Sequence, residues 1–148
     1  MKTISLRYTD KFAPQIGTIE AHSKILKEKG YVWYGKLGLP VSQKVADMIM
    51  DNDNPMFLLI HSGSFERYWV HIDQISRLRP EYADFPEYYH KSADSFNTWF
   101  RVIRIETAEK GVMRKCIVIS SGTSLSEASR HSMSPYFIID YDNEKGES

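Results

Sequence analysis

The chain has 148 residues, of which 42% are hydrophobic and 13% aromatic, and its 19 basic side chains balance 19 acidic ones. This length suits one domain of ~100–150 residues, the composition excludes wholesale disorder, and zero net charge disfavours a sequence-blind polyanion binder. No apolar run approaches the ~18–20 residues of a membrane span, and the single cysteine, Cys116, excludes a disulfide framework. We therefore expect a cytoplasmic protein without cofactors, with one domain over residues 1–141 and an acidic tail over 142–148.

Short strands dominate the predicted secondary structure. In residues 3–8 the side chains of Ile4, Leu6 and Tyr8 share one face, as in a half-buried strand. The continuous apolar run over 56–61 indicates a buried central strand. Further strands are predicted over residues 31–37, 68–75, 98–106, 116–120 and 136–141.

Helices are fewer. Residues 18–29 form an amphipathic helix that Gly30 ends, and we expect it to pack on the sheet through Ile19, Ile25 and Leu26. A short helix is predicted over 42–50 and a helical turn over 126–131, whereas 79–96 reads as a long aromatic loop with one helical turn near Pro86. Because strands and helices do not alternate regularly, the expected fold is α+β, with a curved, mostly antiparallel sheet or small barrel and packed helices.

Catalytic signatures are missing from the sequence. There is no Gly-x-Ser-x-Gly elbow, phosphate-binding glycine loop or His-Glu-x-x-His helix. His71 and Asp73 share a strand face but lack a third metal ligand nearby, so an ordinary polar pair is favoured. His61 and His131 are the candidates for a base-catalysed reaction, although a histidine beside a Ser-Gly turn is more often a hydrogen-bonding loop residue. We expect neither a catalytic nor a metal site.

The unusual feature is the number of aromatic residues, with three Trp, nine Tyr and seven Phe. Several lie among polar residues, which is typical of binding surfaces. A slot between aromatic rings suits a flat base, because stacking contributes ~1–3 kcal/mol per base. A pocket for one extruded base does not require a strongly basic protein.

Trp33 is the leading candidate for a wall of such a slot. In a strand Trp33 and Tyr34 point to opposite faces, and only one of them is expected to join the core. We expect Trp33 to line a pocket opposite an aromatic residue of 82–96, with Gly35 leaving backbone room for a ligand. The alternative is that Trp33 is the core residue and Tyr34 lies at the surface.

The order of the segments 4–8, 29–34, 56–64, 70–75 and 98–102 resembles the YTH and EVE domains of the PUA-like superfamily, over roughly residues 3–106. In those domains a tryptophan at the start of the second strand forms one wall of an aromatic cage, and Trp33 occupies the matching position. The resemblance implies a PUA-like fold and recognition of a modified base. YTH domains read methylated adenine in RNA, and EVE-like domains occur in bacterial modification-dependent restriction systems.

These observations predict a non-catalytic module that reads a methylated base, in DNA rather than RNA, beside a nuclease or motor domain. The alternatives are a module for a free nucleotide or other small ligand, an RNA-modification reader, and a small enzyme or protein-interaction domain. The predicted base-binding residues are Trp33, Tyr34, Ser62, Gly63, Trp69, Tyr88 and Trp99. The residues predicted to contact the nucleic-acid backbone, on the same side of the molecule, are Lys36, Arg101, Arg104, Arg114 and Lys115.

Overall fold

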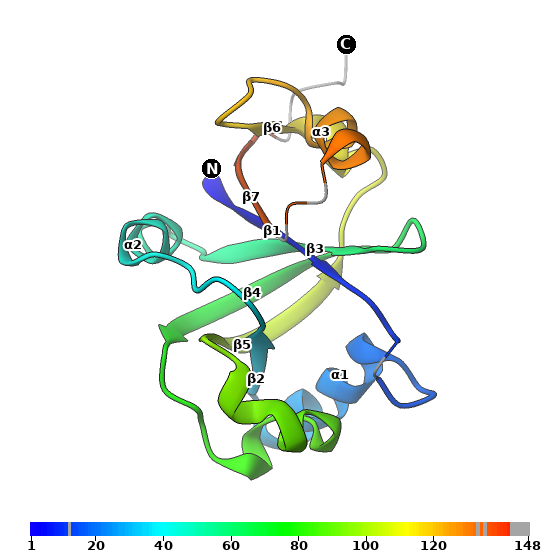
Figure 1. Ribbon diagram of the computed structural model, residues 1–148, viewed down its shortest axis with the longest axis vertical. Coiled ribbons are helices and arrows are strands. Elements are labelled where there is room, and N and C mark those ends of the chain that lie inside the picture. The colour runs from blue at the N-terminus through cyan, green and yellow to red at the C-terminus, as the bar shows by residue number, and fades with distance from the viewer. Residues whose placement is uncertain (12, 133, 135, 143–148) are drawn as a thin grey trace.

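The computed structural model describes residues 1–11, 13–132, 134 and 136–142, so the predicted tail over 142–148 lies outside the described residues except for Asp142. Seven strands form one open, mixed sheet in the order β2-β5-β4-β3-β1-β7-β6 (Figure 1). Among the described strands only β1 and β3 pair in parallel, so the predicted α+β fold with a mostly antiparallel sheet is confirmed. The strands are β1 Lys2–Tyr8, β2 Val32–Lys36, β3 Met56–His61, β4 Arg67–Ser76, β5 Thr98–Thr107, β6 Cys116–Val118 and β7 Tyr136–Tyr141.

Helices cover the sheet at both ends of the molecule. The α-helices are α1 Thr18–Lys29, α2 Gln43–Met50 and α3 Leu125–His131, and the 3-10 helices are η1 Tyr82–Asp84, η2 Glu87–Ser95 and η3 Val112–Lys115. Figure 1 shows α1 and η2 at the end that holds β2, and α3 at the opposite end beside β6 and β7. Residues 79–96, expected to form a long loop, are thus largely 3-10 helical. Their aromatic side chains pack onto the sheet, but these residues do not recur at a helical period in the sequence.

The α1 helix packs as its sequence predicted. Ile19, Ile25 and Leu26 contact the core under the helix, and Ala21 and His22 are buried beside them. The helix ends at Gly30, whose φ of 82° is the left-handed conformation that glycine adopts without strain.

The sheet has a core on each of its faces. In β3, Phe57 and Leu59 point into a first core under α1 and α2, whereas Leu58 and Ile60 point into a second core under α3 and η3. Because successive strand residues alternate between faces, a strand covered on both sides needs apolar residues throughout. The predicted burial of the central strand is confirmed.

A third, aromatic core lies outside β2 and β5, under η1 and η2. Trp33 and Trp99 point into it, while Tyr34 and Phe100 point into the first core. The premise that only one of Trp33 and Tyr34 could be buried is therefore wrong, because both faces of β2 are covered and each side chain is 8% exposed.

Gly35 allows the aromatic core to close against β2. A Cβ atom at this position would lie 3.0 Å from the Phe96 ring and 3.1 Å from the Trp99 ring, so the aromatic core fills the space on the Cβ side of Gly35. We expect Gly35→Ala to lower the free energy of unfolding by about 1–3 kcal/mol through overpacking. Urea titration measures this loss. Gly63→Ala is the control, since its Cβ would approach His61 no closer than 3.5 Å.

Candidate ligand-binding site

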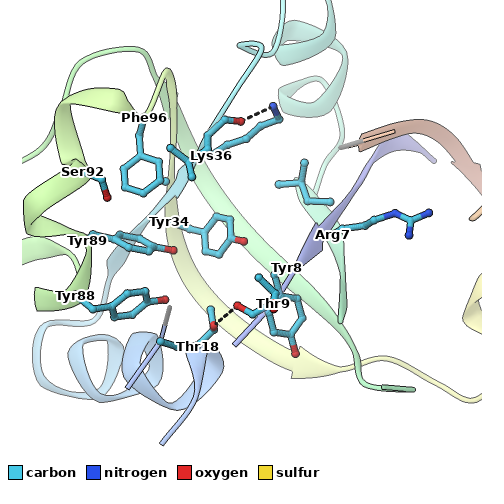
Figure 2. A pocket seen from close by; sticks show the side chains of 14 residues that line it. Arg7, Tyr8, Thr9, Thr18, Tyr34, Lys36, Tyr88, Tyr89, Ser92 and Phe96 are labelled. Atoms are coloured by element: carbon cyan, nitrogen blue, oxygen red, sulfur yellow. Dashed lines mark hydrogen bonds between the residues drawn. The ribbon is translucent and has the colours of Figure 1, made fainter. Parts of the chain in front are cut away.

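A cavity of about 540 Å³ opens where β1, β2, the start of α1 and η2 meet (Figure 2). Its volume falls within the ~300–1,000 Å³ that small-ligand sites occupy. Four tyrosines line it, so we call it the tyrosine cavity: Tyr8 from β1, Tyr34 from β2, and Tyr88 and Tyr89 from η2. Phe96 adds a fifth aromatic ring.

The tyrosines bring hydroxyl groups to the cavity. Figure 2 shows the hydroxyls of Tyr34, Tyr88 and Tyr89 pointing toward the side where Tyr8 and Thr9 lie. Burial raises the pKa of all four tyrosines, so each hydroxyl stays neutral and can donate or accept a hydrogen bond. Among the described residues no carboxylate lines the cavity. The arrangement suits a flat, uncharged ligand with polar edges.

The buried imidazole of His22 packs against two of these rings. Its ring centroid lies 5.2 Å from that of Tyr34 and 5.3 Å from that of Tyr89. Nδ1 donates to the carbonyl of Thr18 at 2.8 Å, while Nε2 is buried and has no hydrogen-bond partner among the described residues. Burial lowers the pKa of His22 to about 4, so the imidazole is neutral. Through His22, the helix α1 thereby supports Tyr34 and Tyr89 of the cavity.

Two cations, Lys36 and Arg7, contribute to the wall farther from the tyrosines. Lys36 Nζ donates to the carbonyls of Leu37 at 3.2 Å and Leu39 at 2.5 Å. Figure 2 shows the charged ends of both side chains directed away from the tyrosine rings. The space beside the rings is therefore neutral, and positive charge lies only at one end of the wall.

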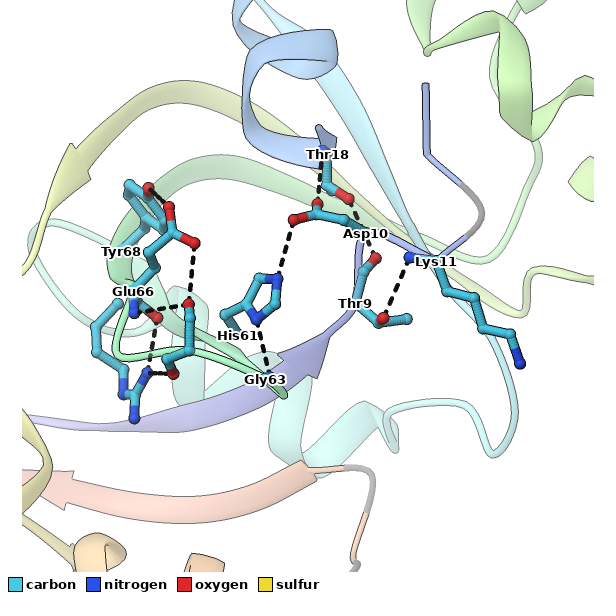
Figure 3. Close-up of polar contacts among 10 residues, drawn as sticks. Thr9, Asp10, Lys11, Thr18, His61, Gly63, Glu66 and Tyr68 are labelled. Atoms are coloured by element: carbon cyan, nitrogen blue, oxygen red, sulfur yellow. Dashed lines mark hydrogen bonds and ion pairs between the residues drawn. The ribbon is translucent and has the colours of Figure 1, made fainter. Parts of the chain in front are cut away.

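At the rim of the cavity, hydrogen bonds connect the loop after β1 to the β3–β4 turn (Figure 3). Asp10 accepts hydrogen bonds from the Thr18 amide and from His61 Nε2, each at 2.9 Å. The Gly63 amide donates to His61 Nδ1 at 2.9 Å, so both ring nitrogens of His61 are engaged. The Thr18 amide is the main reason that the pKa of Asp10 is lowered.

The sequence model of the Pua-like family matches residues 4–139. The chain belongs to the Pua-like family. No curated protein and no solved structure gives a significant match to it. Membership indicates binding of nucleic acid or another ligand, and domains of this kind are generally binding modules rather than enzymes.

In this Pua-like domain the predicted base-binding residues separate into two groups. Tyr34 and Tyr88 line the tyrosine cavity. Trp33 and Trp99 lie behind it in the aromatic core, and Trp69 packs in the second core, 4.8 Å from the Tyr141 ring. All three tryptophans are thus buried away from the cavity. The 3-10 helices η1 and η2 cover Trp33 and Trp99, and the sequence did not indicate this apolar cover.

Ser62 and Gly63 lie near the cavity without lining it. The Ser62 amide donates to the carbonyl of Tyr8 at 2.8 Å, which joins the β3–β4 turn to the end of β1. With the His61 contact of Gly63, this places both residues in the support of the rim.

The basic residues predicted to surround the cavity do not gather there. Lys36 lines the cavity, but Arg101 pairs with Asp73 at 2.5 Å and Arg104 pairs with Glu106 at 2.7 Å. Arg114 and Lys115 belong to η3, which packs against α3. Carboxylates of β4 and β5 thus neutralise Arg101 and Arg104. Arg114 and Lys115 lie at the opposite end of the molecule, beside α3.

His71 and Asp73, which the sequence predicted as a polar pair, each bind a different partner. His71 Nε2 lies 2.8 Å from Glu106 Oε1, while Asp73 pairs with Arg101. In the part of the chain that the structure describes, no group of three metal-ligating residues is present and no helix is long and apolar enough to span a membrane.

The sequence offered only weak signals for the remaining cavity residues. Tyr89 and Phe96 were among several aromatics of one predicted loop. Tyr8 read as a core residue of its strand, and it is 6% exposed. A ring that lines a cavity and a ring in a core have the same periodicity, so no local pattern separates them.

Proposed function

We propose that this Pua-like domain holds one flat nucleobase in the tyrosine cavity, either extruded from a duplex or taken from a single strand. The observation that carries the proposal is a cavity of about 540 Å³ with four neutral tyrosines and no carboxylate among its described lining residues. Aromatic rings supply stacking surface for any base, and the hydroxyls supply partners for its polar edge.

We further propose that the base is methylated and that the polymer is DNA, as in the restriction and defence systems that contain EVE-like domains. The apolar side chains of Leu6, Leu37 and Phe96 in the cavity wall support a site for a methyl group. Burying one methyl contributes about 0.8 kcal/mol, or roughly fourfold in affinity. A nuclease or motor domain beside this module would act on the DNA that it selects.

A binding screen tests the proposal with fluorescent oligonucleotides, DNA and RNA, carrying unmodified, methylated or hydroxymethylated bases. We expect the methylated DNA to bind most tightly. Tyr88→Ala should weaken binding about tenfold or more, because one stacking partner is lost. Tyr82→Ala is the matched control, since Tyr82 belongs to the neighbouring 3-10 helix and does not line the cavity. Equal affinity of the two variants would contradict the proposed site.

The second candidate is a module for a free nucleotide or other small ligand. The zero net charge and the neutral space beside the tyrosines favour it. Such a ligand would bind with little dependence on salt, whereas each phosphate contact to a single strand adds about 0.7 to the log–log salt slope. A nucleoside that binds as tightly as an oligonucleotide, at all salt concentrations, would favour this candidate.

A further inference from the structure

A second cavity of about 680 Å³ lies along α3, β6 and β7. Four serines line it, so we call it the serine cavity: Ser120, Ser121, Ser132 and Ser134. The rings of Tyr136 and Phe137 also contribute to its wall. The hydroxyl groups give this cavity hydrogen-bonding partners, and the aromatic rings give it stacking surface.

Arg7 and Lys36 lie between the two cavities. Both line the tyrosine cavity, and each reaches a residue of the serine cavity. Arg7 Nη2 donates to the carbonyl of Ser132 at 2.7 Å, and its guanidinium lies 5.8 Å from the centroid of the Phe137 ring. Lys36 Nζ lies 5.0 Å from the centroid of the Tyr136 ring. The two cavities therefore share a positively charged boundary.

The charge at this boundary is not neutralised within the described part of the chain. Neither Arg7 nor Lys36 forms an ion pair there, and both are held by main-chain carbonyls. The Lys36 residue is 6% exposed, and Arg7 Nε is buried without a hydrogen-bond partner. A buried cation without an anion is costly, so this boundary favours a ligand that brings negative charge.

We propose that the two cavities are successive nucleotide subsites for one nucleic-acid strand. The base in the tyrosine cavity is followed by a phosphodiester at Arg7 and Lys36, and the next nucleotide occupies the serine cavity. This inference rests on the proposed function, because it assumes a base in the tyrosine cavity. It adds that the domain reads a flanking nucleotide. Glu127, the one carboxylate among the described lining residues, lies on the serine cavity and would accept from an amino group of that nucleotide.

The first test compares ligands that differ by one phosphodiester and one nucleotide. Isothermal titration measures binding of N6-methyldeoxyadenosine and 5-methyldeoxycytidine, each as a free nucleoside and within dinucleotides that extend it in either direction. We expect one dinucleotide to bind at least tenfold more tightly than its nucleoside at low salt. Lys36→Met should remove most of that gain, whereas Lys44→Met, which removes a cation from an exposed site on α2 outside both cavities, should retain it.

The second test fills the serine cavity. Ser121 is exposed, so Ser121→Trp places a large ring there with little expected effect on the core. We expect it to weaken the dinucleotide at least fivefold and to leave nucleoside binding unchanged, while Gln43→Trp on α2 changes neither. Nucleosides that bind as tightly as both dinucleotides, but more weakly than the methylated oligonucleotide, would overturn the second subsite and leave the proposed function standing. Failure of every ligand and of the oligonucleotide screen would overturn both.

Discussion

Acidification from pH 6.5 to pH 4 should destabilise the protein by roughly 3 kcal/mol through one side chain, His22. Its imidazole is 2% exposed, and burial lowers its pKa from 6.5 in the unfolded chain to about 4 in the fold. Between these values the unfolded chain binds more protons, so every drop in pH favours unfolding. Above about pH 6.5 the imidazole is neutral in both the folded and the unfolded chain, so the full stability is present. The difference between the two pKa values sets the size of the loss at lower pH.

Urea titrations at several pH values, on the wild type and on His22→Phe, measure this effect. The phenylalanine ring keeps packing against Tyr34 and Tyr89 but has no proton to bind, so the variant should lose the slope between pH 6.5 and 4. His131→Phe, at an exposed position, should keep it. Asp10 has a lowered pKa, and its contribution is lost only at more acidic pH. An unchanged slope in His22→Phe would show that other groups cause the acid sensitivity.

Replacing Trp33 with alanine should lower the free energy of unfolding by about 3–5 kcal/mol. The side chain is 8% exposed and packs with Phe85, Tyr89, Phe96 and Trp99. Its removal leaves a large void in a rigid cluster of rings, and such voids carry both a transfer cost and a cavity cost. Urea titration monitored by circular dichroism gives the difference.

The Trp33→Ala result separates a core role from a ligand-binding role. Phe65→Ala is the control, because Phe65 is 96% exposed and its removal should change stability by no more than about 0.5 kcal/mol. A Trp33→Ala protein that is as stable as the wild type but has lost oligonucleotide binding would show that Trp33 belongs to the ligand-binding wall and not to the core.

The order and type of most elements follow from local chemistry. The strands β3 and β7 and the helix α1 occupy the predicted ranges, because apolar periodicity and a terminating glycine act over a few residues. The 3-10 helix Glu87–Ser95 was the main omission. Its Tyr89 ring contacts Trp99 of β5, at 6.3 Å between centroids, and this packing onto the sheet leaves no helical period in the sequence.

The sequence by itself determined a family resemblance, a curved α+β sheet, and an excess of aromatic residues with binding potential. Tertiary structure alone decided which rings line a cavity. Trp33 and Tyr34 are adjacent and equally buried, yet only Tyr34 lines the tyrosine cavity, because 3-10 helices cover the other face of β2. Charge followed the same rule, since Arg101 is neutralised by Asp73, 28 positions away, whereas Arg7 and Lys36 meet carbonyls. The residues that cover Trp33 and the carboxylate that neutralises Arg101 are distant from them in sequence, and local patterns do not specify such partners.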